Sequence, residues 1–158
     1  MRFSALPLLA LAGLAAAQNK ATINLPKSGT SIAPGEVFDF QYNTMADYGV
    51  TSYNYTVWLF TSGLPSSFAP SLNWADGHFF GRFSEPNYPG NTNPTNLPPA
   101  TLTMPNFSKS PGGFGAGLAE ANQNCAFVVM EEYATGAGSF GLRISLTSNT
   151  IIYNATSS

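Results

Sequence analysis

The side chains that could carry acid–base chemistry are few, and their spacing does not favour it. Charged residues make up 9% of the 158-residue chain. Glu131 and Glu132 are adjacent in an apolar run that should form a strand, so they are expected to point to opposite faces. A glycosidase needs two carboxyl groups that face each other across the substrate. Asp76 and Glu85 could do so from one loop, although their spacing does not require it, and glycan hydrolysis is therefore a weak alternative.

Nucleophilic, metal and dinucleotide chemistry find no better support. The chain has one histidine, His78, one cysteine, Cys125, and no GxSxG motif, so it lacks a nucleophile elbow and the three or four ligands typical of zinc. Residues 136–141 spell GxGxxG, but residues 142–146 have a strand period where a dinucleotide site needs a helix. Gln18, the expected mature N-terminus, disfavours a copper oxidase that binds metal through an N-terminal histidine. The sequence predicts no catalytic residue, no metal and no cofactor.

One segment, residues 63–99, has the composition of a binding surface. It is dense in proline and glycine, and its aromatic side chains alternate with short polar ones, a mix that interfaces favour. Phe79 and Phe83 are expected to share one strand face and Phe80 the other. The alternative, that these rings complete the core or cover a sheet edge, stays open. The candidate binding residues are Trp74, Asp76, Phe80 and Tyr88.

Alternation of apolar and polar residues predicts the elements that must hold this segment. Short strands are expected, the last two joined by a turn at Ser148-Asn149, over residues 21–25, 38–42, 52–61, 78–83, 100–104, 125–133, 140–146 and 150–154. The strand at 52–61 carries large side chains on both faces, and the one at 140–146 has the pattern of a half-exposed strand. A helix of about two turns is possible across 117–124. Seven or so strands without a sustained helical period predict an all-β, immunoglobulin- or fibronectin-like antiparallel sandwich.

The first 17 residues have the pattern of a secretory signal peptide. Arg2 gives a basic start, residues 6–14 form an apolar run too short to span a bilayer, and three alanines precede Gln18. We therefore expect residues 18–158 to form one secreted, extracellular domain with no membrane span. Three triplets fit N-glycosylation acceptors, and they begin at Asn54, Asn106 and Asn154.

Charge and cysteine content limit the partners further. Six basic residues against eight acidic ones give a net charge of −2 without a basic patch, which disfavours nucleic acid and anionic lipid. Cys125 leads into the apolar run 126–130 and is expected to be buried as a small core residue rather than paired between chains. The sequence carries no signal for the oligomeric state.

Several short motifs resemble small fungal secreted proteins with an immunoglobulin-like sandwich. The resemblance is to necrosis-inducing secreted effectors and, more distantly, to the N-terminal domains of Ser/Thr-rich cell-wall and glucan-assembly proteins. The motifs are, in order, residues 23–26 (INLP), 29–35 (GTSIAPG), Phe38-x-Phe40, Gly81-Arg82-Phe83, 98–105, the apolar strand through Val129, and the glycines of 136–141. The resemblance implies a non-enzymatic extracellular protein, because such effectors are associated with plant immune receptor kinases and the wall group with β-glucan assembly.

The leading hypothesis is a secreted, effector-like interaction protein whose aromatic segment and exposed strand edges contact an extracellular protein. The alternative is a role in wall assembly, or binding to a cell-wall polysaccharide such as β-glucan or chitin, through Trp74 and its neighbours.

Overall fold

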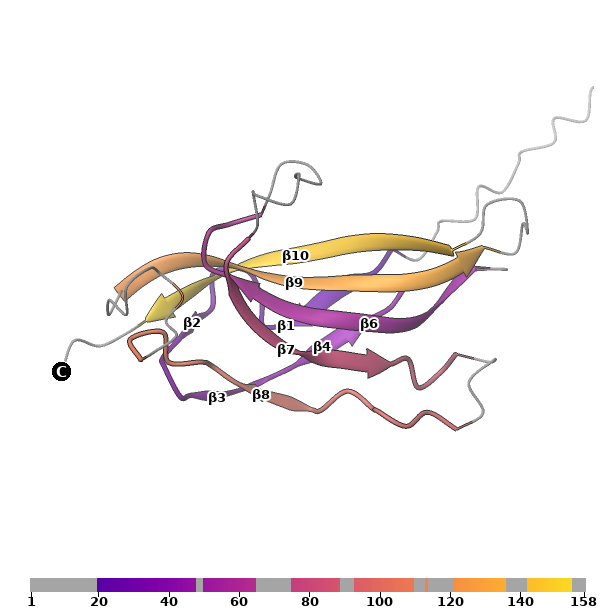
Figure 1. The fold of residues 1–158 in the computed structure, drawn as a ribbon, viewed down its shortest axis with the longest axis horizontal. Coiled ribbons are helices and arrows are strands. Elements are labelled where there is room, and N and C mark those ends of the chain that lie inside the picture. The colour runs from indigo at the N-terminus through magenta and orange to yellow at the C-terminus, as the bar shows by residue number, and fades with distance from the viewer. Residues whose placement is uncertain are drawn as a thin grey trace, which may run out of the picture.

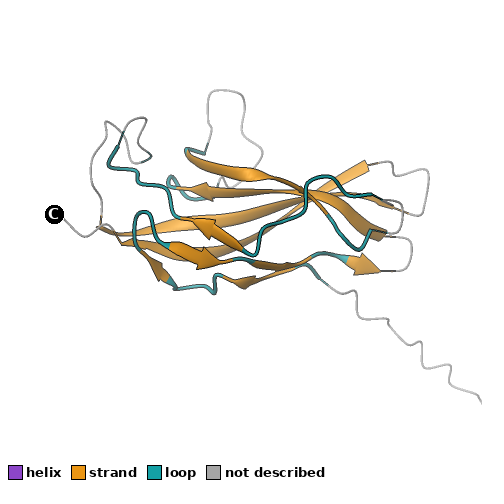
Figure 2. Ribbon diagram, turned by 90° about the horizontal axis from the view of Figure 1, so that it is seen from below, coloured by secondary structure: helices purple, strands orange, loops and turns teal. Residues whose placement is uncertain are grey.

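Strands and loops make up the described part of the molecule. The computed structural model describes residues 20–47, 50–64, 75–88, 93–109, 113, 121–135 and 142–154, and these contain no helix (Figures 1 and 2). These described residues therefore include no helix long and apolar enough to cross a membrane. The ten strands are β1 (Thr22–Leu25), β2 (Ser31–Ile32), β3 (Val37–Asp39), β4 (Gln41–Asn43), β5 (Ala46–Asp47), β6 (Val50–Phe60), β7 (Gly77–Ser84), β8 (Thr101–Thr103), β9 (Ala121–Thr135) and β10 (Leu142–Asn154).

Six strands form one large sheet. Its order is β2-β10-β9-β6-β5, and β7 also pairs with β6. The pairs β10–β9, β9–β6 and β6–β7 are antiparallel and continuous over most of their lengths, whereas the short β2 runs parallel to β10. The three longest strands, β6, β9 and β10, therefore lie side by side and form the centre of the large sheet (Figure 1).

Four short strands form the facing layer. Strand β3 pairs with β8, and β4 pairs with β1. Phe40, between β3 and β4, donates its N–H to the carbonyl of Ala100 at 2.8 Å, so the segment 37–43 continues from one pairing into the other. Figure 1 shows β3 and β8 below the large sheet and β1 and β4 behind β6 and β7. The predicted immunoglobulin-like β-sandwich is confirmed.

The strand count exceeds the seven or so expected because the N-terminal region is more broken than its apolar pattern suggests. Between β1 and β3 the chain turns at Gly29 and again at Gly35, with φ of +83° and +76°. Glycine adopts such angles without strain. The interruption leaves room for β2 to leave the facing layer and pair with β10 in the large sheet.

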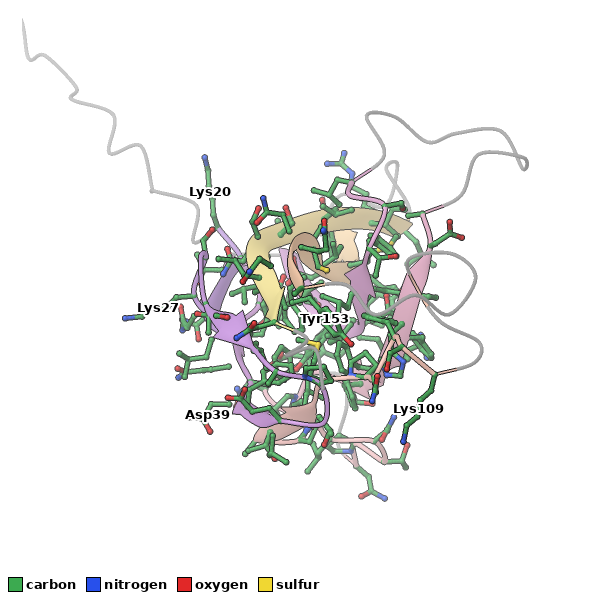
Figure 3. The ribbon with its side chains drawn as sticks, turned by 90° about the vertical axis from the view of Figure 1, so that its left-hand side faces the viewer. Lys20, Lys27, Asp39, Lys109 and Tyr153 are labelled. Carbon is green, nitrogen blue, oxygen red and sulfur yellow. The ribbon has the colours of Figure 1, made fainter. Side chains whose placement is uncertain are left out.

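Aromatic side chains fill the space between the layers. Phe127 of β9 is fully buried and contacts the rings of Phe38, Phe40 and Phe80 at centroid distances of 6.1, 5.9 and 5.8 Å. Figure 3, which looks at one end of the sandwich, shows Tyr153 in the interior. Cys125 is buried, as its neighbours predict, and burial raises the pKa of its thiol to about 11. A thiol with such a pKa stays protonated and unreactive near neutral pH.

The turn predicted at Ser148-Asn149 is wrong. Strand β10 runs unbroken through both residues, which pair with Val128 and Phe127 of β9. The side chain of Asn149 is turned inward, and its Nδ2 donates to the carbonyl of Ile23 at 3.1 Å and to that of Pro26 at 2.9 Å. Asn149 therefore links the two layers instead of closing a hairpin.

The unbroken β10 also decides which of its side chains face the core. Ile151 and Tyr153 are fully buried, and successive residues of a strand alternate between faces, so Thr147 and Ser145 share their inner face. The half-exposed strand expected at 140–146 is wrong for its described part, because Leu142, Arg143, Ile144 and Leu146 are all exposed and Ser145 alone is half-buried. The apolar residues Leu142, Ile144 and Leu146 lie on the outer face.

The helix expected across 117–124 is wrong for its second half. Residues 121–124 belong to β9, where they pair with the end of β10. Asn122 has a φ of 56° next to the register shift between Tyr153 and Asn154, which marks a bulge. Residues 117–120 lie outside the described part. The long partner strand β10 stabilises extended structure where the local sequence alone would allow a helix.

Candidate functional site

The candidate binding residues of segment 63–99 do not come together in the described structure. Asp76 is exposed just before β7, and Tyr88 lies beyond the other end of β7, where its ring is 6.0 Å from that of Tyr53. Phe80 lies between them and packs against the core. Trp74 lies outside the described residues. Asp76 and Glu85 are nine positions apart along one extended strand, which corresponds to roughly 30 Å, so they do not face each other.

A bulge in β7 reverses the faces expected for its phenylalanines. Val57 pairs with Gly81 and Trp58 with Phe79, so the register skips Phe80. As a result Phe83 is buried in the core while Phe79, 47% exposed, lies on the other face of the sheet. The expectation that Phe79 and Phe83 share a face is therefore wrong. Gly81 makes the bulge possible, because its φ is +153° and a Cβ there would lie 2.8 Å from the Phe83 ring.

Phe79 belongs to an aromatic group on the outer face of the large sheet. Its ring centroid lies 4.5 Å from that of Trp58, and Trp58 lies 5.8 Å from Phe60. Trp58 and Phe60 occupy alternate positions of β6, opposite in direction to the buried Val57 and Leu59. Trp58 is half-buried rather than lost in the core, so the two-sided burial predicted for this strand is confirmed.

A row of aliphatic side chains on β10 continues this group diagonally across the sheet. Leu142, Ile144 and Leu146 are 74%, 53% and 46% exposed. Leu146 pairs across to Met130 on β9, and the next outward residue of β9, Val128, pairs with Trp58. The band crosses four strands that are ~4.8 Å apart and extends by three two-residue steps of ~6.7 Å along them. The diagonal of these two extents is roughly 25 Å. We name this surface the apolar band; it consists of Phe79, Trp58, Phe60, Met130, Leu146, Ile144 and Leu142, and Val128 lies fully buried beneath it, between the aromatic and aliphatic parts.

Polar side chains lie on both sides of the apolar band. On one side, Arg82 of β7 reaches over β6 and makes two hydrogen bonds to Glu132 of β9, from Nε to Oε1 at 2.8 Å and from Nη2 to Oε2 at 2.6 Å. These bonds lower the pKa of the Glu132 carboxyl. With its amide oriented to suit its neighbours, Asn54 accepts from Arg82 at 3.0 Å. On the other side, Ser148 and Thr150 are exposed on β10. The band thus resembles the centre of a protein interface with a polar rim.

The inner face below the band holds a buried acid. Glu131 is fully buried, and its carboxyl accepts from the N–H of Met45 at 2.8 Å and from the hydroxyl of Ser145 at 3.0 Å. Burial raises the pKa of Tyr42 and of Tyr55 well above the usual range, and Glu131 adds to both shifts. The Tyr42 hydroxyl is itself buried, near Glu131 and Thr147. As expected, Glu131 and Glu132 lie on opposite faces of β9, and Glu131 is positioned to hold the 43–45 segment rather than to meet a substrate.

The histidine on the inner side of β7 gives a pH-dependent prediction. His78 contacts the Phe80 ring at 4.7 Å, and partial burial lowers its pKa from the usual 6.5. Below about pH 6.5 the unfolded chain therefore binds protons more readily than the folded one, so stability is lost as the pH falls. We expect the free energy of unfolding in urea to decrease between pH 7 and pH 5, and His78→Gln to flatten that slope. Since the sequence has one histidine, an equal slope in the variant would contradict the assignment.

Sequence reasoning missed most of the apolar band. Trp58 was expected at a half-buried position, but nothing marked it as part of a surface. The aliphatic row could have been found from the burial of Ile151 and Tyr153, because counting back by twos along an unbroken strand assigns Leu142, Ile144 and Leu146 to the opposite face. The predicted turn at Ser148-Asn149 concealed this relation.

Comparisons with known proteins give little further guidance. No family model matches the chain, and no curated protein matches it. A solved structure described as the extended catalytic domain of H. jecorina LPMO9A, also known as EG4, is similar with a TM-score of 0.41 and 11% sequence identity. The match covers 84% of this chain, which spans half (50%) of the length of that one. Within the residues described above, no group of three or more His, Cys, Asp or Glu side chains is placed to hold a metal ion.

Proposed function

We propose that this protein is a secreted, non-enzymatic interaction protein that binds an extracellular protein through the apolar band. The observation that carries the proposal is the aliphatic row Leu142, Ile144 and Leu146, which is exposed on the same outer face of the large sheet as the Trp58–Phe79 aromatic group. Exposed apolar patches of this kind on soluble proteins mark interaction sites. The resemblance to fungal secreted effectors agrees with this function.

The chemistry of the band favours one class of partner. Arg82 and Glu132, the charged side chains described on its borders, neutralise each other. A partner surface therefore gains nothing from charge at the centre of the contact, and a buried unpaired charge there would be costly. These features fit a protein that presents an uncharged, aliphatic surface, such as the face of another sheet.

A second candidate function is binding of a wall polysaccharide on the Trp58–Phe79 rings, which could stack against sugar rings. Their planes are inclined by 43° rather than coplanar, and the aliphatic half of the band offers sugars no comparable contact. Retention on insoluble β-glucan or chitin that is abolished by Trp58→Ala but unchanged by Ile144→Lys would favour this candidate over the protein partner.

Site-specific photo-crosslinking tests the proposal. A photoreactive phenylalanine analogue is placed at Ile144 or Phe79, and at Val37 as the matched control, because Val37 is an aliphatic residue 62% exposed on β3 of the other layer. Each protein is irradiated in fluid washed from the extracellular space of plant tissue. We expect one adduct of the same mass from both band positions and none from Val37.

Point variants then measure the contribution of the band. Once the adduct is identified, Leu146→Lys is expected to weaken binding of the purified partner about tenfold or more, as for a central interface residue, and Val37→Lys to leave it unchanged. Three results would overturn the proposal: no adduct from the band, an equal adduct from Val37, or an adduct with the mass of a second copy of this chain.

A further inference from the structure

The turn after β8 is anchored on both sides and presents one asparagine to solvent. Met104 and Phe107 are 1% and 3% exposed. The Phe107 ring lies 5.3 Å from the ring of Tyr153, and its backbone N–H donates to the Tyr153 hydroxyl at 3.0 Å. Asn106 and Ser108 alternate with these buried residues and are exposed. The turn is therefore fixed to the core while its polar side chains point outward.

The side chain of Asn106 is held in a defined orientation by the other polar residue of its triplet. Its Oδ1 accepts from the backbone N–H of Ser108 at 3.0 Å and also from the Ser108 hydroxyl. The N–H of Lys109 closes the turn onto the Asn106 carbonyl at 3.3 Å. The carboxamide oxygen is thus engaged, and for Nδ2 of Asn106 the described residues provide no acceptor. This nitrogen is the atom to which an N-linked glycan is attached.

The triplet at Asn54 has the opposite surroundings. Asn54 lies inside β6 and is paired with β7 on one side and β9 on the other. Its side chain is half-buried, its Nδ2 donates to the Tyr53 carbonyl at 3.1 Å and its Oδ1 accepts from Arg82. A glycan on this half-buried Nδ2 would have to fit against the Tyr53 carbonyl and would extend over the outer face beside Arg82. The third triplet, at Asn154, runs into residues outside the described part.

We infer that Asn106 carries an N-linked glycan and that Asn54 does not. In the transfer, Nδ2 of Asn106 attacks C1 of the first sugar of a lipid-pyrophosphate-linked oligosaccharide. The N–C bond forms, the bond between C1 and the pyrophosphate oxygen breaks, the lipid pyrophosphate leaves, and the displaced Nδ2 proton passes to a base of the transferase. This inference rests on secretion, which is part of the proposed function.

The position of the glycan is compatible with binding through the apolar band. Phe107 contacts Tyr153, which points to the inner side of β10, so the turn lies on the side of β10 that faces away from the band. Lys109, the residue that closes the turn, projects from the periphery in Figure 3. A glycan on Asn106 therefore shields the facing layer and leaves the outer face of the large sheet accessible.

Glycopeptide mapping of the full chain secreted from a eukaryotic host tests the inference. Peptide N-glycosidase in ¹⁸O water converts each glycosylated asparagine to a labelled aspartate. We expect the label at Asn106, its loss in Ser108→Ala, and no change in the glycan mass with Asn54→Gln. Ser108 is exposed, so its replacement by alanine should not prevent folding. A label at Asn54, or a label at Asn106 that persists in Ser108→Ala, would overturn the inference, whereas a label at Asn154 does not bear on it.

A parallel arm separates the site from the assumption of secretion. Residues 18–158 are expressed behind the signal peptide of the host. A label at Asn106 in this arm alone would uphold the site and count against secretion by the chain's own leader. An unmodified Asn106 in both arms, in protein recovered from the medium, would refute the site whatever the fate of the proposed function.

Discussion

Phe127→Ala is expected to lower the free energy of unfolding by about 3–5 kcal/mol, the usual cost of removing a buried phenylalanine. Phe127 is fully buried, and it contacts Phe38 and Phe40 of the facing layer as well as Phe80 at the bulge of β7. Its loss leaves three rings without their common neighbour. Since both layers depend on it, the surroundings can collapse only in part, and the cavity contributes to the loss.

Urea denaturation followed by intrinsic fluorescence measures this effect, and Phe79→Ala is the matched control. Phe79 has the same side chain and lies 47% exposed on the outer face. We expect its replacement to change stability by about 1 kcal/mol or less, although it removes one end of the apolar band. Comparable losses in the two variants would show that the core is not centred on Phe127.

Glu131→Ala is expected to destabilise the fold by about 3 kcal/mol or more, because two hydrogen-bond donors lose their acceptor in the interior. The Met45 N–H and the Ser145 hydroxyl both donate to the Glu131 carboxyl. The Glu131 side chain is fully buried, and its two donors are half-buried, so the alanine variant leaves a cavity beside them. Hydrogen exchange provides a local readout, since the Met45 amide should exchange much faster in the variant.

Two further variants separate this role from charge. Glu131→Gln keeps a carbonyl oxygen for Met45 and should retain much of the stability lost in the alanine variant. Glu132→Ala removes the neighbouring carboxylate on the opposite face, and the exposed pair with Arg82 should contribute about 1 kcal/mol or less. If Glu132→Ala cost as much as Glu131→Ala, the buried hydrogen bonds would not be the source of the effect.

Local pattern predicted the fold class because it depends on features that recur along the chain. Alternation in 52–61 correctly separated Val57 and Leu59 from Trp58 and Phe60, and the apolar run at 125–133 is the centre of β9. The predictions that failed involve contacts between distant residues. The Asn149 side chain donates hydrogen bonds to the carbonyls of Ile23 and Pro26, and β10 runs on through this residue. No feature of residues 146–151 alone predicts those partners.

The candidate site was less predictable for the same reason. The proline, glycine and aromatic content of residues 63–99 predicts a binding surface. Within the described part of that segment, however, Phe80 and Phe83 pack against the core. The bulge that turns Phe79 outward arises from the register with β6, which a single sequence does not display. The aliphatic row was not recognised as a surface because an apolar strand face is ordinarily assigned to the core. In β10 the core-facing side belongs to Ile151 and Tyr153, and Leu142, Ile144 and Leu146 lie on the opposite side.

The parallel pairing of β2 with β10 also determines how the domain would respond to a mechanical load. Tension that enters before β2 and leaves after β10 pulls the two strands past each other along their length. The bonds that join them, including the N–H of Gly29 to Thr150 and the N–H of Ile152 to Thr30, are then strained together, whereas an antiparallel hairpin pulled at its open end breaks one bond at a time. A sandwich built this way resists tension that is applied between its N-terminal segment and the end of β10.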